Sequence, residues 1–298
     1  MNVTCIQMNM ALGQVDQNFA HAEFLVRQAM VPMAASVTAN DGLDAKSTQE
    51  YATEEALQAT VWQRPDTIVL PETWNTGFFP KQRLRELCDK DGRRTKSVFG
   101  SLAKELNVNI IAGSVANLKA DGIYNTCYVF NRQGNCIAEY DKTHLFSPMG
   151  EDKYFQKGNR LCRFELDGVK CAVIICYDVR FPDFCRSLTV HGVDIMFMVS
   201  QWPLPRLAHL QVLTRARAIE NQMFFVCCNS VAVAENTVYA GNSAIISPWG
   251  DIISQASGKK EQIISAKCDI NVVTGIRQSI NVFADRRPEL NDLSYYKE

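Results

Sequence analysis

Short apolar runs alternate along the chain with longer segments in which apolar residues recur every three or four positions. Short runs of this kind predict buried strands, and the periodic segments predict amphipathic helices. The predicted strands cover residues 3–8, 67–70, 109–114, 125–131, 136–141, 172–175, 195–199, 223–229 and 243–246. The predicted helices cover residues 18–33, 51–62, 93–107, 182–191 and 207–221.

Turn residues indicate how several of these strands are joined. Residues 132–135 (RQGN) and the pair Asp167-Gly168 each separate two strand-like runs, so each predicts a hairpin. Residues 248–251 (PWGD) predict a further turn, followed by two strands and a helical tail. Strands that alternate with helices and carry inserted hairpins favour a layered α/β architecture with a mixed sheet.

The chain shows no linker that would divide it, so we expect residues 1–298 to form a single domain. Residues 34–50 (AASVTANDGLDAKSTQE) are small and polar. We expect this stretch to be a surface insertion that is free to move.

Composition narrows the class of protein. Hydrophobic residues make up 47% of the chain, charged residues make up 21%, and the net charge is −1. These values are typical of a globular protein with a sizeable core, and they argue against nucleic acid or an anionic membrane surface as a partner. We see no phosphate-binding loop, dinucleotide fingerprint, signal peptide or membrane span.

The 11 cysteines are scattered and odd in number, which suits reduced thiols in a cytoplasmic protein better than a disulfide framework. No Cys-x-x-Cys motif occurs and the four histidines are far apart, so we expect no metal site.

Three predicted strands end on chemically useful side chains. Cys176 follows the run 172–175, Glu72 follows the strand 67–70, and Lys142 follows the strand 136–141. Each residue alone has an ordinary structural explanation: a buried thiol, a solvated carboxylate and a surface ion pair. Together they supply a nucleophile, a base and a cation, which is a set that suits acyl transfer.

The sequence around these residues resembles the nitrilase, or carbon–nitrogen hydrolase, superfamily. Three motifs carry the resemblance: Leu70-Pro71-Glu72, Asp141-Lys142-Thr143-His144-Leu145 and Ile175-Cys176-Tyr177-Asp178-Val179-Arg180-Phe181-Pro182. Further matches are Trp202-Pro203, residues 215–221 (RARAIEN), Gly241-Asn242-Ser243 and Pro248-Trp249-Gly250. The resemblance extends from residue 3 to about residue 268, and the insertion 34–50 is its main departure.

The resemblance implies a four-layer α-β-β-α sandwich and a homodimer in which two sandwiches extend each other. It implies Glu72 as general base, Lys142 as oxyanion stabiliser and Cys176 as nucleophile, with Glu151 as a supporting glutamate. Asp152, beside Glu151, is an alternative for that supporting place. The resemblance implies no cofactor and no metal.

The family chemistry is amide hydrolysis through a thioester. The motifs look most like the ω-amidase branch, whose members release ammonia from the terminal amide of 2-oxo acids such as 2-oxoglutaramate. Alternatives are a nitrilase, an N-carbamoyl amino-acid amidohydrolase, or an inactive member that serves as an interaction protein. The implied partner is a small-molecule amide.

Three further residues are candidates for substrate binding. The backbone N–H of Tyr177 is placed to stabilise an oxyanion, and Trp202 to form a wall of the acyl pocket. Arg180 suits a substrate carboxylate, because its planar fork can hold both oxygens. Arg180 also has a structural alternative, which is an ion pair with Asp178 or Asp183 that braces the turn.

Overall fold

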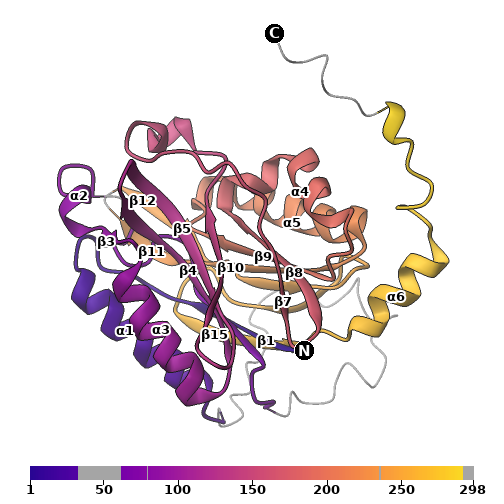
Figure 1. The fold of residues 1–298 in the computed structure, drawn as a ribbon, viewed down its shortest axis with the longest axis horizontal. Coiled ribbons are helices and arrows are strands. Elements are labelled where there is room, and N and C mark those ends of the chain that lie inside the picture. Colours follow the sequence, from indigo (N-terminus) through magenta and orange to yellow (C-terminus); the bar gives the residue numbers. More distant parts are fainter. Residues whose placement is uncertain (33–61, 79, 235, 291–298) are drawn as a thin grey trace, which may run out of the picture.

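Two mixed sheets lie face to face at the centre of the molecule (Figure 1). The computed structural model describes residues 1–32, 62–78, 80–234 and 236–290. The first sheet has the order β15 (Gln262–Lys267), β1 (Asn2–Gln7), β2 (Thr67–Val69), β4 (Asn109–Lys119), β5 (Gly122–Phe130) and β6 (Cys136–Asp141), with β3 (Asp89–Lys90) also paired to β4. The second sheet has the order β14 (Ile252–Gln255), β13 (Ala244–Ile246), β10 (Phe224–Asn229), β9 (Ile195–Ser200), β8 (Val169–Ile175) and β7 (Arg163–Leu166).

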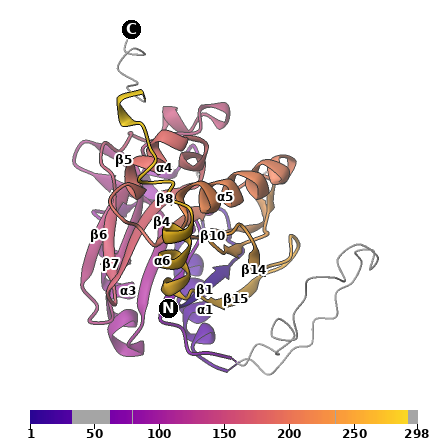
Figure 2. The same ribbon diagram turned by 90° about the vertical axis from the view of Figure 1, so that its right-hand side faces the viewer.

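Helices cover the outer face of each sheet (Figures 1 and 2). The first sheet carries α1 (Val15–Ala29) and α3 (Arg93–Leu106), and the second carries α4 (Pro182–Thr189) and α5 (Leu207–Asn221). Two smaller helices are α2 (Leu84–Leu87) and α6 (Ile270–Ser279), and the short hairpin β11 (Val231–Ala234)–β12 (Thr237–Ala240) forms a separate two-stranded sheet. The result is the expected four-layer α-β-β-α sandwich.

The alternation of side chains along the strands explains the four layers. Neighbouring residues of a strand point to opposite faces. In β1, Cys5 belongs to the core between the sheets, whereas Ile6 belongs to the core beneath α1 and α3. In β4, Ile111 likewise belongs to the core between the sheets, and Ile110 belongs to the core beneath α1 and α3. Both faces of this sheet are therefore apolar, which is why its strands read as continuous hydrophobic runs.

Most predicted elements are present, with shifted ends. The helix predicted from residue 18 begins at Val15 and ends at Ala29, and the strand predicted for 109–114 continues to Lys119. Both predicted hairpins are confirmed, as β5–β6 and β7–β8. The β11–β12 hairpin was not predicted. The insertion 34–50, and the helix predicted for 51–62 apart from Trp62, lie outside the described residues.

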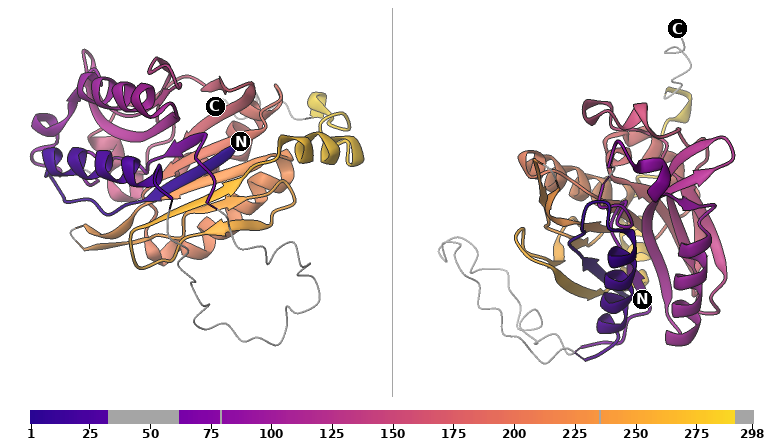
Figure 3. Two further views of the ribbon diagram at one scale, coloured as in Figure 1. Left: turned by 90° about the horizontal axis from the view of Figure 1, so that it is seen from below. Right: turned by 90° about the vertical axis from the view of Figure 1, so that its left-hand side faces the viewer.

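The first strand of the described chain, β1, and its last strand, β15, are neighbours in the first sheet. Strand β1 pairs with β2 in parallel and with β15 in antiparallel orientation, so residues near 2 and 267 lie side by side (Figure 3). In the portion of the chain that the structure describes, no helix is both long enough and apolar enough to cross a membrane.

Candidate active site

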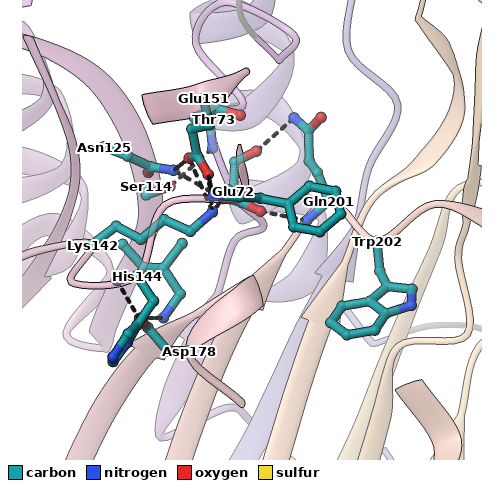
Figure 4. A network of polar contacts seen from close by, with 12 residues as sticks. Glu72, Thr73, Ser114, Asn125, Lys142, His144, Glu151, Asp178, Gln201 and Trp202 are labelled. Atoms are coloured by element: carbon teal, nitrogen blue, oxygen red, sulfur yellow. Dashed lines mark hydrogen bonds and ion pairs between the residues drawn. The ribbon is translucent and has the colours of Figure 1, made fainter. Parts of the chain in front are cut away.

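The three candidate catalytic residues converge at one edge of the sandwich. Glu72 follows β2, Lys142 follows β6, and Cys176 follows β8 of the other sheet. Lys142 Nζ lies 2.7 Å from Glu72 Oε1, and Cys176 lines the same pocket as both. Glu72 and Lys142 are only 3% and 2% exposed. The strand ends of two facing sheets thus bring together residues that are far apart in the sequence (Figure 4).

Glu151, rather than Asp152, occupies the supporting position. Both carboxylate oxygens of Glu151 accept hydrogen bonds from Lys142 Nζ, at 3.0 and 2.9 Å, and the Phe146 N–H donates to Oε2 at 2.7 Å. Glu151 is buried, whereas Asp152 is exposed. The sequence alternative of Asp152 in this role is therefore wrong. Lys142 is a single cation held between two carboxylates.

Two further residues, which the sequence reasoning missed, orient the glutamates. Asn125 Nδ2 donates to Glu72 Oε1 at 2.8 Å and to Glu151 Oε1 at 3.2 Å. The Gln201 backbone N–H donates to Glu72 Oε2 at 2.8 Å, and its side-chain amide donates to the Glu72 carbonyl at 2.7 Å. A buried asparagine in an apolar strand, and a glutamine directly before Trp202, are the sequence signals that could have indicated them.

A sharp bend presents Cys176. Its φ is 45°, a left-handed value that few non-glycine residues adopt, and the 3-10 helix η4 (Cys176–Arg180) starts there rather than an open turn. Asp178 braces this bend because its Oδ2 accepts from the Ile175 N–H at 2.9 Å and from the Tyr140 hydroxyl at 2.7 Å. Its Oδ1 accepts from the backbone N–H and Nδ1 of His144, at 3.0 and 2.8 Å. The Asp178 carboxylate therefore ties the bend at Cys176 to the segment that carries Lys142.

Burial and the charges nearby set the resting protonation of the site. Burial raises the pKa of the Cys176 thiol, the Glu72 carboxylate raises it further, and Lys142 opposes both effects only in part. Burial also disfavours the charge of Lys142, but the carboxylates of Glu151 and Glu72 outweigh it and hold the pKa of Lys142 well above its usual value. These shifts favour a neutral thiol beside a charged lysine over a thiolate–lysine pair at rest.

A pocket with an empty volume of about 410 Å³, including its mouth, opens above these residues. Tyr177, Arg180 and Trp202 all line it, as do Arg206 and Phe146, which the sequence reasoning missed. The side chain of Tyr177 packs edge-on against Phe146, with ring centroids 4.9 Å apart. Aromatic rings and guanidinium groups thus surround the approach to Cys176.

The two pocket arginines contact aromatic rings, and Arg180 also contacts a histidine. Arg180 Cζ lies 4.8 Å from the Trp202 ring centroid, and its Nη2 lies 3.2 Å from His209 Nδ1. Arg206 Cζ lies 5.1 Å from the Phe146 ring centroid. Neither arginine forms an ion pair with a carboxylate among the described residues, so the alternative in which Arg180 pairs with an aspartate of its own turn is wrong.

No cluster of three metal-ligating side chains occurs among residues 1–32, 62–78, 80–234 and 236–290. The polar contacts of Glu72 and Glu151 described above are made with Lys142, amide groups and backbone N–H groups.

Comparisons with known proteins identify the family of this chain. The profile of the carbon–nitrogen hydrolase family matches residues 2–278. A 2-oxoglutaramate amidase from Bacillus subtilis is 38% identical over 288 residues, which cover 97% of this chain and 98% of that protein. The ω-amidase YafV from Escherichia coli is 33% identical over 221 residues, covering 74% of this chain and 84% of that protein.

Solved structures share the fold. A carbon–nitrogen hydrolase from Helicobacter pylori superposes with a TM-score of 0.80 at 20% identity, covering 99% of this chain and 98% of that one. The fold, the family match and the amidase relatives agree. The chain belongs to the carbon–nitrogen hydrolase family, whose members hydrolyse carbon–nitrogen bonds other than peptide bonds.

Proposed function

We propose that this enzyme releases ammonia from the terminal amide of a small carboxylate-bearing substrate such as 2-oxoglutaramate. The observation that carries the proposal is a pair of arginines, Arg180 and Arg206, that have no carboxylate partner in the described part of the chain and lie beside the buried Glu72, Lys142 and Cys176. The relatives named 2-oxoglutaramate amidase and ω-amidase support the same substrate class.

In the first half-reaction, Glu72 takes the proton of the Cys176 thiol as the sulfur attacks the amide carbon. A base is needed because the thiolate is the nucleophile, and burial keeps this thiol protonated at rest. Lys142 and the Tyr177 backbone N–H stabilise the oxyanion. Glu72 then passes its proton to the amide nitrogen, and the C–N bond breaks. Ammonia departs, and the acyl group remains bound to Cys176 as a thioester.

In the second half-reaction, Glu72 removes a proton from water, which attacks the thioester carbon. The same donors stabilise the second oxyanion. The C–S bond then breaks, the acid leaves, and the sulfur recovers its proton from Glu72. Glu151 and Asn125 keep Lys142 and Glu72 in place throughout, because they bind these residues directly.

Substrate choice follows from the pocket's charge. A carboxylate that enters the pocket meets the guanidinium of Arg180, which lies on the Trp202 ring with its charge unpaired among the described residues. Arg206, on the Phe146 ring, offers a second cation for the distal end of the substrate. A neutral amide of equal length gains from neither arginine.

An Arg180→Lys variant tests this recognition. Lysine keeps the positive charge but lacks the planar fork that holds both carboxylate oxygens. We expect KM for 2-oxoglutaramate to rise about tenfold, the loss of roughly one charge-assisted hydrogen bond, while kcat/KM for a neutral amide such as butyramide stays unchanged. The control is Arg163→Lys, at an exposed position of β7.

The same assay separates the alternatives. Unchanged discrimination by a folded Arg180→Lys protein would remove Arg180 from the binding role. If the wild-type enzyme turned over nitriles or N-carbamoyl amino acids faster than 2-oxoglutaramate, the corresponding alternative would be favoured over the ω-amidase proposal. Absence of ammonia release from every substrate would favour an inactive interaction protein.

We further propose that the chain is a single domain, acts in the cytoplasm and works as a homodimer. The scattered reduced cysteines support the compartment, since all 11 are free and most are buried. An exposed apolar face on α5 supports self-association: Val212 is 66% exposed and Ile219, seven residues on, is 49% exposed. The exposed Trp249 lies in the turn beside Ile219 and extends this face.

A further inference from the structure

Ser200 is the neighbour of Cys176 at the edge of the second sheet. Strands β8 and β9 pair in parallel, with Ile175 opposite Val199, and the next residues along the chain are Cys176, directly after β8, and Ser200, the last residue of β9. Ser200 is fully buried. Strand register therefore places a hydroxyl beside the nucleophile.

The backbone of Ser200 is fixed, whereas its hydroxyl is not engaged. The Ser200 carbonyl accepts from the Ser230 N–H at 3.1 Å and from the Glu72 N–H at 3.4 Å. Its hydroxyl has no well-formed hydrogen bond with any residue that the structure describes. A buried hydroxyl without a partner costs stability, and its hydrogen can rotate toward an acceptor that gains charge.

The acceptor within reach is the sulfur. Four groups act on Cys176: Glu72 raises its pKa, and Lys142, the Ser200 hydroxyl and the Gln201 backbone N–H lower it. Lys142 is engaged by two glutamates, and the Gln201 N–H donates to Glu72. Of these three donors, only the Ser200 hydroxyl has no other hydrogen-bond partner among the described residues.

We propose that the Ser200 hydroxyl donates a hydrogen bond to the Cys176 sulfur whenever the sulfur carries negative charge. This occurs twice in each turnover. In the first half-reaction the thiol proton moves to Glu72 and the sulfur forms its bond to carbon. In the second, the C–S bond breaks and its electron pair returns to the sulfur, which leaves as a thiolate. Lys142 stabilises the negative charge on the oxyanion, and the Ser200 hydroxyl stabilises the negative charge on the Cys176 sulfur.

The inference rests on the proposed role of Cys176 as nucleophile, and its test needs no amide substrate. The rate of Cys176 alkylation by iodoacetamide, followed by peptide mass mapping at fixed pH between 6 and 9, reports thiolate formation directly. A failure to hydrolyse 2-oxoglutaramate would leave this measurement intact, so the two proposals fail separately.

Three variants define the experiment: Ser200→Ala, Ser200→Thr and Ser230→Ala. Ser230 is the matched control, because it is buried one strand away, its hydroxyl also lacks a partner among the described residues, and it does not act on the sulfur. Ser200→Ala removes no existing hydrogen bond, so we expect it to fold with an unchanged Tm.

We expect Ser200→Ala to slow Cys176 alkylation about tenfold at each pH, equivalent to an upward shift of about one pKa unit. Ser230→Ala should match the wild type, and Ser200→Thr should recover most of the rate because it retains the hydroxyl. An alkylation rate of Ser200→Ala within twofold of the wild type would overturn the proposal. Equal slowing in Ser230→Ala or in Ser200→Thr would also overturn it, because packing would then explain the effect.

Discussion

At the scale of single residues, the main feature of the site is that two buried carboxylates share one lysine. Glu72 and Glu151 both bind Lys142, and all three side chains are nearly inaccessible to water. Asn125 adds two N–H donors to the same carboxylates. In the proposed mechanism Glu72 transfers protons and Glu151 keeps Lys142 charged and in place, so the two glutamates should respond differently to substitution.

Replacing Glu72 by glutamine should remove proton transfer and keep the fold. The amide is nearly isosteric and can still contact Lys142 and Asn125. We expect kcat for ammonia release to fall by about 10²–10⁴, the usual worth of a positioned base. Glu165→Gln, at an exposed position of β7, is the control. A folded Glu72→Gln enzyme with near wild-type kcat would show that another group is the base.

Lys142→Met should destabilise the protein as well as inactivate it. Two buried carboxylates would lose their cation, and breaking a buried ion pair in this way costs about 3–5 kcal/mol. Lys119→Met is the control: Lys119 pairs with Asp141 at 22% side-chain exposure, and we expect a loss of about 1 kcal/mol there. Denaturant unfolding at pH 8 measures both losses.

The pH dependence of the Lys142 contribution has a definite sign. The folded-state pKa of Lys142 is raised, so its stabilisation is fully present below the unfolded pKa of about 10.4 and is lost as pH rises through the folded pKa. Between pH 7 and 9, the stability gap between wild type and Lys142→Met should therefore stay constant. A gap that closes in this range would contradict the charge assignment.

At the scale of elements, the bend at Cys176 depends on Asp178. This carboxylate accepts four hydrogen bonds and is fully buried, and its donors come from the ends of β6 and β8. Asp178→Asn replaces one accepting oxygen by an amide that meets N–H or O–H donors. We expect a loss of about 1–3 kcal/mol in unfolding free energy.

The same substitution should lower kcat more than it changes KM, because it loosens the nucleophile relative to Lys142 while leaving the pocket arginines in place. Steady-state kinetics with 2-oxoglutaramate check this. Asp183→Asn, in the exposed first turn of α4, should change neither quantity. Equal effects of the two variants would show that Asp178 has no special role at the bend.

Sequence patterns predicted which residues lie at strand ends, but they did not predict the contacts between residues of different strands. Glu72, Lys142 and Cys176 were predictable because each comes after the end of a predicted strand, and the family resemblance joined them. Gln201 and Asn125 were not predictable, because their bonds to Glu72 span 129 and 53 residues. The Gln201 contact depends on how the two sheets face each other, and the Asn125 contact depends on the order of strands within the first sheet. The pocket position of Arg206 was missed because it depends on the packing of residues that are far apart in the sequence, and the β11–β12 hairpin was not predicted.

At the scale of the whole molecule, the proposed homodimer places the exposed apolar residues of α5 at the interface between subunits. Val212, Ile219 and Trp249 form one exposed face on the α5 side. Val212→Glu should weaken self-association, because a buried interface disfavours an unpaired charge. Phe24→Glu, at a 55% exposed position of α1 on the opposite layer, is the control.

Sedimentation velocity over a range of concentrations measures the effect. We expect a dimer for the wild type and for Phe24→Glu, and monomer at low concentration for Val212→Glu. A wild-type monomer at all concentrations, or dissociation by Phe24→Glu alone, would rule out the α5 face as the interface.

The pairing of β1 with β15 has a consequence for how the protein is made. Residues 2–7 leave the ribosome before the other strands of the first sheet, but among the described residues their outer hydrogen-bonding edge pairs with residues 262–267. At about 5–20 residues per second, synthesis of the intervening chain takes roughly 13–50 s. During that time the nascent chain carries an apolar strand with an open edge, which is a template for association with other chains. Completion of the first sheet must therefore wait until residues 262–267 have been synthesised, and the yield of folded protein should depend on chaperones that shield this edge.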